Sequence, residues 1–267
     1  MKVGRLETTT THAVLVVMSV IALYPLVTIL ASSLSSSDPG HSWLTAYVTA
    51  WTQGNFASAL LSSAIVATTV VVVTVIVACL AGYALATMLI PLAGLISAAL
   101  LVGIVLPYEV TVLPLYELLS GWGLVGTYWG LILPQIGLSV PLGVFWMRSF
   151  FASIPTELLE AARIDGASRF QTLRLVMLPV AVPAIATLTT ILFLFTWNEF
   201  LLALILVPDN SSVQTAPLSL SFFAGNERSS DPSVTAAAAV LVALPIVIAY
   251  VVLQRRLITG IVEGAVK

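Results

Sequence analysis

The sequence predicts an all-α membrane protein with six transmembrane helices, forming a single domain over residues 1–267. Hydrophobic residues make up 59% of the chain and charged residues only 8%, whereas a soluble domain carries about 25% charged residues. The apolar residues form long continuous runs and do not alternate with polar ones. Such runs favour helices over barrel strands, because a helix satisfies its backbone polar groups within its own segment.

Each apolar run is long enough to cross about 30 Å of hydrocarbon at a rise of about 1.5 Å per residue. The expected spans are residues 13–31, 58–84, 92–116, 126–147, 180–206 and 232–254. The second and third runs almost merge, since no charged residue occurs between Asp38 and Glu109. We place their boundary at the helix breakers Gly82, Pro91 and Gly94.

The first run also has some features of a cleaved signal peptide. Lys2 and Arg5 supply a basic start, and the small residues after Ala31 resemble a weak cleavage site. Its apolar stretch of about 19 residues nevertheless exceeds the roughly 7–15 residues of a signal-peptide core. We therefore expect a retained membrane anchor.

The basic residues predict the orientation of the spans. There are ten of them: Lys2, Arg5, Arg148, Arg163, Arg169, Arg174, Arg228, Arg255, Arg256 and Lys267. Six spans place the N-terminus, the segment between the fourth and fifth spans, and the C-terminus on one side of the membrane. Nine of the ten basic residues fall on that side and only Arg228 does not. Because short cytoplasmic segments are enriched in Lys and Arg, both termini are expected in the cytoplasm.

Composition excludes several other kinds of function. The formal net charge is −2 and no basic cluster occurs that would bind phosphates, so a nucleic-acid partner is not expected. The chain has one cysteine, Cys79, and two histidines, His12 and His41, without a ligand spacing. We expect no intrachain disulfide, no metal site and no cofactor.

The segment 148–179, between the fourth and fifth spans, reads as two short amphipathic helices joined by a turn. Pro155 suits the first turn of a helix, and Gly166 suits the left-handed residue that ends it. Ser168 and Gln171 have the spacing of a capping box that starts a second helix, expected to end at about Leu178, before Pro179. Two interpretations stay open on physical grounds: the pair lies on the lipid surface, or it docks into a groove of a partner.

The segment also resembles a known family. Glu160-Ala161-Ala162, Gly166 and Leu178-Pro179 are similar to the EAA loop of ABC-importer permeases. Three further stretches are similar to the carbohydrate-uptake branch, specifically the maltose-type second permease: the stretch from Leu106 to Tyr116, Trp197-Asn198-Glu199-Phe200, and the tail from Gln254 to Lys267.

The resemblance implies the ABC type I importer permease fold in a bacterial or archaeal cytoplasmic membrane, and a transport subunit without enzymatic activity. Its implied partners are a homologous second permease, a dimer of ATP-hydrolysing subunits, an extracellular substrate-binding protein, the lipid bilayer and a carbohydrate substrate. It also implies that part of the EAA loop couples this chain to the ATPase. The implied coupling residues are Glu160, Ala161, Ala162, Asp165 and Gly166.

Three polar residues within the spans are candidates for the translocation path: Glu109, Asn198 and Glu199. An ionisable group within a membrane span is a functional candidate by default. Each also has a structural alternative. Glu109 could be an interfacial residue beside a kink at Pro107, and Asn198 and Glu199 could form hydrogen bonds between helices.

Two alternatives for the function also stay open. One is the same machinery importing glycerol-phosphate compounds or polyols, and the other is a secondary transporter driven by an ion gradient.

Overall fold

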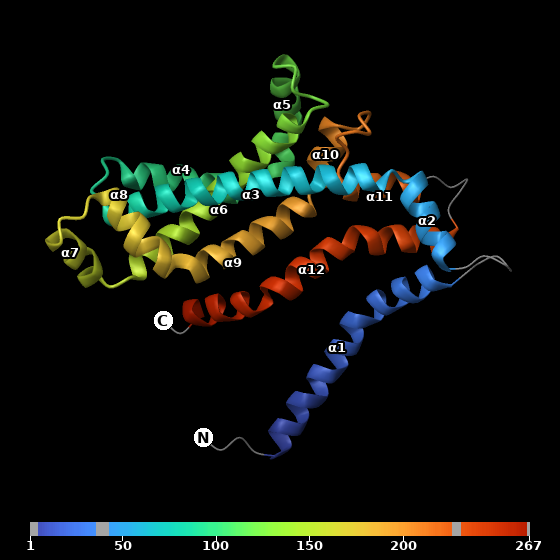
Figure 1. The fold of residues 1–267 in the computed structure, drawn as a ribbon, viewed down its shortest axis with the longest axis horizontal. Helices are drawn as coiled ribbons and strands as arrows, with labels where there is room; N and C mark the ends of the chain where they lie inside the picture. The colour runs from blue at the N-terminus through green and yellow to red at the C-terminus, as the bar shows by residue number, and fades with distance from the viewer. Residues whose placement is uncertain (1–4, 36–42, 226–230, 266–267) are drawn as a thin grey trace. The chain divides into compact units, whose positions relative to one another are not determined.

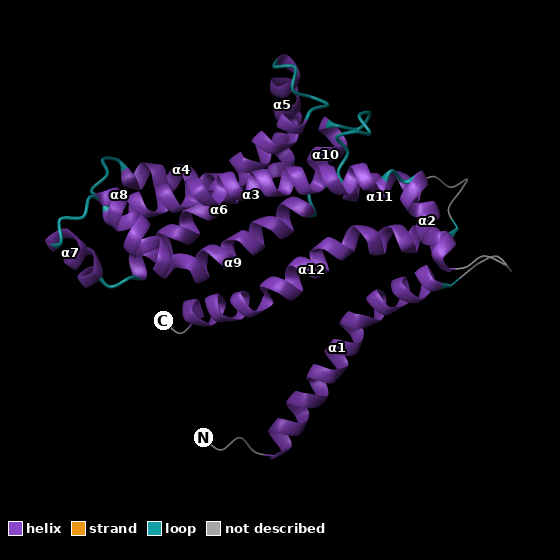
Figure 2. Cartoon of the chain, viewed as in Figure 1, coloured by secondary structure: helices purple, strands orange, loops and turns teal. Residues whose placement is uncertain are grey.

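The computed structural model describes residues 5–35, 43–225 and 231–265, and within these ranges every regular element is a helix (Figure 2). The prediction of an all-α protein is therefore confirmed. The chain divides into two compact units, Met1–Ala57 with Ser219–Leu244 and Ser58–Leu218 with Pro245–Lys267. The single permease domain expected from the sequence stays a prediction.

The first unit contains helices from both ends of the chain. They are α1 (Arg5–Leu34), α2 (Trp43–Gln53), part of α11 (Ala216–Gly225) and the first part of α12 (Pro232–Ala265) (Figure 1). The hydroxyls of Ser33 and Tyr47 lie 2.9 Å apart and join α1 to α2. The Ser219 hydroxyl donates to the Gly54 carbonyl at 2.7 Å. These bonds satisfy polar groups where the helices of this unit end.

The second unit contains most of the helices. They are α3 (Phe56–Thr87), α4 (Ala93–Val105), α5 (Tyr108–Gly121), α6 (Tyr128–Ser153), α7 (Thr156–Ile164), α8 (Arg169–Thr172), α9 (Leu178–Trp197) and α10 (Leu201–Leu206). A π-helical turn, Leu173–Met177, joins α8 to α9.

The described helices include five that are long and apolar enough to cross a membrane, or six if the bent pair α4 and α5 is one span. This agrees with the six expected spans, but two of those spans are not straight. The third is bent by 98° between α4 and α5, where Pro107 lacks the backbone N–H that would continue the helix. The fifth is interrupted between Trp197 and Leu201.

The boundary between the second and third spans differs from the prediction in one respect. Helix α3 continues through Gly82 to Thr87, and the break comes at residues 88–92, which include Pro91. Gly82 is instead a site of close approach, because a Cβ there would lie 2.8 Å from the backbone nitrogen of Arg148. On α6, a Cβ at Gly143 would lie 3.0 Å from the Cβ of Ala78. Small residues of this kind allow membrane helices to pack backbone to backbone.

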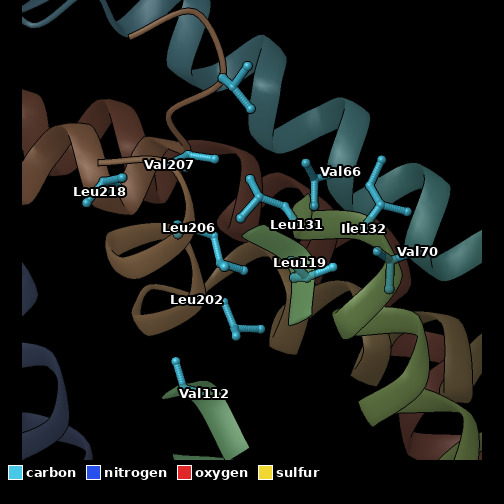
Figure 3. Packing of buried hydrophobic residues seen from close by; sticks show 12 residues of the cluster. Val66, Val70, Val112, Leu119, Leu131, Ile132, Leu202, Leu206, Val207 and Leu218 are labelled. Carbon is cyan, nitrogen blue, oxygen red and sulfur yellow. The ribbon is translucent and has the colours of Figure 1, made fainter. Parts of the chain in front are cut away.

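Two apolar clusters organise the second unit. One joins α3, α5, α6, α10 and the segment after α10 (Figure 3). There the Gly126 N–H donates to the Leu206 carbonyl at 2.7 Å, and the Asn210 amide donates to the Gly126 carbonyl at 2.8 Å. The other cluster joins α3, α6, the π turn and α9, and contains the fully buried Met147 and Met177. The segment 148–179 emerges from this second cluster.

Candidate functional site

Helix α7 ends at Gly166 in a Schellman motif. Gly166 has a φ of +75°, a conformation that glycine adopts without a side-chain clash. The Gly166 N–H donates to the Arg163 carbonyl at 3.0 Å, and the Ala167 N–H donates to the Ala162 carbonyl at 2.9 Å. These two bonds satisfy carbonyls that the helix end would otherwise leave unpaired. The predicted left-handed stop at Gly166 is confirmed.

The predicted capping box that starts the next helix is also present. The Gln171 N–H donates to the Ser168 hydroxyl at 3.3 Å, and the Ser168 N–H donates to the Gln171 side chain at 2.8 Å. The expected end of this helix before Pro179 is wrong, because the helical run continues from Arg169 to Trp197. The π turn ends at Met177, two residues before Pro179. Because Pro179 lacks an N–H, it cannot make the regular bond to the carbonyl four residues earlier, and the chain accommodates it within a continuous helical run.

The two faces of α7 have different surroundings. Ala162 is 7% exposed, and Leu159 packs against the cluster that contains Met177. Of the five predicted coupling residues, the other four are exposed: Glu160, Ala161, Asp165 and Gly166. Ala162 therefore allows α7 to approach this chain itself, while the exposed side of the helix carries the carboxylates of Glu157 and Glu160 together with Arg163 and Ile164.

The segment is anchored to the C-terminal end of α3. The Tyr83 hydroxyl donates to the Arg169 carbonyl at 3.2 Å, and Tyr83 packs edge-to-face on Phe151 at 5.9 Å between ring centroids. The Arg169 guanidinium lies 3.7 Å from the sulfur of Met88. A side-chain hydrogen bond and packed aromatic rings thus join the start of α8 to α3 and α6.

A second candidate site is a cavity of about 990 Å³ at the two interrupted spans. Its walls include the α4–α5 bend, the α9–α10 break and one face of α6. All three predicted path residues, Glu109, Asn198 and Glu199, line this cavity. Residues that are about 90 positions apart in the sequence are thus brought to one place.

The side chains of Asn198 and Glu199 make local hydrogen bonds. The Glu199 carboxylate accepts from the backbone N–H groups of Leu202 and Ala203 at 2.9 and 3.3 Å, so it caps the start of α10. The Asn198 amide donates to the Leu194 carbonyl at 2.8 Å, within its own helix. These hydrogen bonds are local and do not join distant helices, unlike the interhelical bonds that the sequence left open for Asn198 and Glu199.

One polar residue of the cavity escaped the sequence analysis. Gln135 lies on α6, lines the cavity and is 4% exposed. Its side-chain oxygen is buried and has no hydrogen-bond partner among the residues that the structure describes. Gln135 carries no charge, so it is not an ionisable group within a span, although a lone glutamine in an apolar run also indicates a polar contact inside the membrane.

Comparison with known proteins decides the family. Residues 79–262 match the family described as binding-protein-dependent transport system inner membrane component. This match covers most of the chain, including both candidate sites. The chain belongs to this family. It is a multi-pass membrane permease of the ABC-importer class, as the resemblance of the EAA segment predicted.

Individual relatives agree with this assignment. The permease is 35% identical to the trehalose transport system permease protein SugB of Mycobacterium tuberculosis, over 79% of this chain and 77% of the relative. It is 31% identical to the diacetylchitobiose uptake system permease protein NgcG of Streptomyces coelicolor, over 95% and 87% of the two chains. A crystal structure of a bacterial ABC transporter involved in the import of the acidic polysaccharide alginate has the same fold, with a TM-score of 0.76, 22% identity, and coverage of 96% of this chain and 98% of that chain.

Proposed function

We propose that this permease forms half of a translocation pathway for a mono- or oligosaccharide and is coupled to a separate ATPase. Two relatives named for the disaccharides trehalose and diacetylchitobiose support the substrate class. The cavity supports it as well, because aromatic residues such as Phe195 and Phe200 line it together with several polar groups. Ligand sites commonly combine an apolar lining with a few placed polar groups.

The observation that carries the coupling role is the exposed acidic face of α7. A Schellman motif and a capping box hold the turn after this helix rigidly, and Tyr83 anchors α8 to α3. Glu160 and Asp165 repel anionic lipid headgroups, which favours docking into a protein groove over lying on the membrane. We infer that Glu160, Ala161, Asp165 and Gly166 contact the ATPase, whereas Ala162 positions α7 on this chain.

The partners follow from what the sequence lacks and from the family. The sequence has no phosphate loop of the G-x-x-x-x-G-K-[ST] kind, so a dimer of ATP-hydrolysing subunits supplies the energy. A homologous permease completes the pathway, and an extracellular binding protein delivers the carbohydrate. Segment 148–179 and both termini face the cytoplasm, which places the ATPase on the side where the basic residues gather.

Reconstitution tests this function directly. The permease, its second permease and the ATPase are placed in proteoliposomes with the binding protein, and uptake of labelled trehalose and diacetylchitobiose is measured with and without ATP. We expect uptake that requires ATP and both partner subunits. Uptake by this chain alone, driven by an ion gradient without ATP, would establish the secondary-transporter alternative. Uptake of glycerol phosphate or a polyol, without uptake of either disaccharide, would contradict a carbohydrate substrate and establish the glycerol-phosphate or polyol alternative.

A further inference from the structure

The side-chain oxygen of Gln135 is buried without a partner among the described residues. Its residue is 4% exposed and its Oε1 atom accepts no hydrogen bond from the described part of the chain. Buried polar side-chain atoms are paired in the large majority of cases. An apolar residue at this place on α6 would avoid the cost of burying an amide. The unpaired oxygen therefore points to a ligand that enters the cavity.

We propose that Gln135 hydrogen-bonds a hydroxyl group of the transported carbohydrate and helps determine which carbohydrate passes; this rests on the function proposed above. A glutamine side chain both donates and accepts, as a sugar hydroxyl does. Ser139 lies one helical turn further along α6 and lines the same cavity. Tyr108 and Thr196 add two more hydroxyl groups to its wall.

The charge of the cavity narrows the class of ligand. Glu109 and Glu199 line it, and the described residues of its wall include neither lysine nor arginine. Two carboxylates without a cation beside them disfavour an anionic solute, because like charges repel. The site thus suits a neutral carbohydrate and disfavours a glycerol-phosphate compound. At about 990 Å³ the cavity also has the size of sites that hold ligands of drug size.

The test compares sugars that differ by one hydroxyl. Uptake of trehalose and of each of its monodeoxy analogues is measured in proteoliposomes holding the full complex, for the wild type and for Gln135→Met, a near-isosteric apolar variant. Dividing the variant rate by the wild-type rate for each sugar cancels the preference of the binding protein. We expect Gln135→Met to slow trehalose uptake about tenfold, the effect of one lost hydrogen bond. For one analogue this loss should disappear, because that analogue lacks the hydroxyl that Gln135 binds.

Thr74→Val is the matched control. Thr74 also has a buried hydroxyl without a partner in the described ranges of the chain, but it does not line the cavity. Removal of this hydroxyl should therefore change the uptake of every sugar by the same factor. If diacetylchitobiose and not trehalose is the transported sugar, its monodeoxy analogues form the panel.

Several outcomes would overturn the role of Gln135. An equal loss for all analogues would show that Gln135 packs against the second permease and does not bind the sugar, and an unchanged rate would show no role. If Gln135→Met does not assemble, the same panel is run with Gln135→Asn, which keeps the amide; failure of both to assemble would make Gln135 structural and refute the proposal. Failure of the proposed function is recognised separately, since wild-type complexes would then take up no carbohydrate.

Discussion

Gly82 shows how one missing side chain sets the distance between two helices. A Cβ at this position would lie 2.8 Å from both the Arg148 nitrogen and the Met147 Cβ, so Gly82→Val should push α3 from α6. We expect this overpacking to lower the free energy of unfolding by about 1–3 kcal/mol, measured by thermal unfolding of the complex in detergent. Gly137→Ala is the control, because no atom lies within 4 Å of the added Cβ. That change should stabilise by about 0.5–1 kcal/mol.

Glu199 caps the start of α10 in addition to lining the cavity. Glu199→Ala removes the acceptor for the N–H groups of Leu202 and Ala203, and the loss of such a cap costs about 0.5–2 kcal/mol. Thermal unfolding of the complex should therefore occur at a lower temperature. Glu109→Ala is a matched control in the same cavity. Because Glu109 is exposed, this substitution should leave the unfolding temperature unchanged. Equal destabilisation by the two changes would contradict the capping role.

At the scale of an element, α7 offers two consecutive alanines, about 100° apart around the helix, with different surroundings. Ala162 is buried against this chain and Ala161 is exposed. Ala162→Leu should destabilise the permease by about 1–3 kcal/mol through overpacking, as measured by its thermal unfolding. Ala161→Leu should leave unfolding unchanged and instead weaken binding of the ATPase, measured by copurification and by sugar-stimulated ATP hydrolysis. If Ala161→Leu hydrolysed ATP with normal coupling, the exposed face would not be the docking surface.

For the whole molecule, the features predicted correctly were those that depend on local chemistry. The apolar runs predicted the spans, because a continuous apolar segment in lipid forms a helix that pairs its own backbone N–H and carbonyl groups. Gly166 and the pair Ser168 and Gln171 predicted a turn that each residue makes with its own neighbours. Pro107 marks a place where the third run is expected to bend, but the 98° angle was not predicted. The break after Trp197 was missed, because neither proline nor glycine occurs at residues 198–200.

For the candidate sites too, the residues could be predicted from local sequence, but their arrangement in space could not. The EAA segment was recognisable because its residues are contiguous, and Glu109 and Glu199 because they carry charge within apolar runs. Their meeting in one cavity depends on the tertiary arrangement of α5, α6 and α10. The inward direction of Ala162 likewise depends on the cluster beneath α7. A sequence pattern identifies such residues but does not show which of them lie close together in the folded protein.

The orientation of the chain in the membrane is the remaining prediction at this scale. The only cysteine, Cys79, is buried, and Cys79→Ser supplies a background for single cysteines at the exposed positions Thr156 and Ser211. Because the distribution of basic residues predicts a cytoplasmic location for segment 148–179, Thr156→Cys should react with a membrane-impermeant maleimide only in inside-out vesicles. Ser211→Cys, beyond α10, should react in intact cells. The reverse pattern would put the acidic face of α7 outside, where no ATP is available, and would remove both the coupling role and the position of the ATPase.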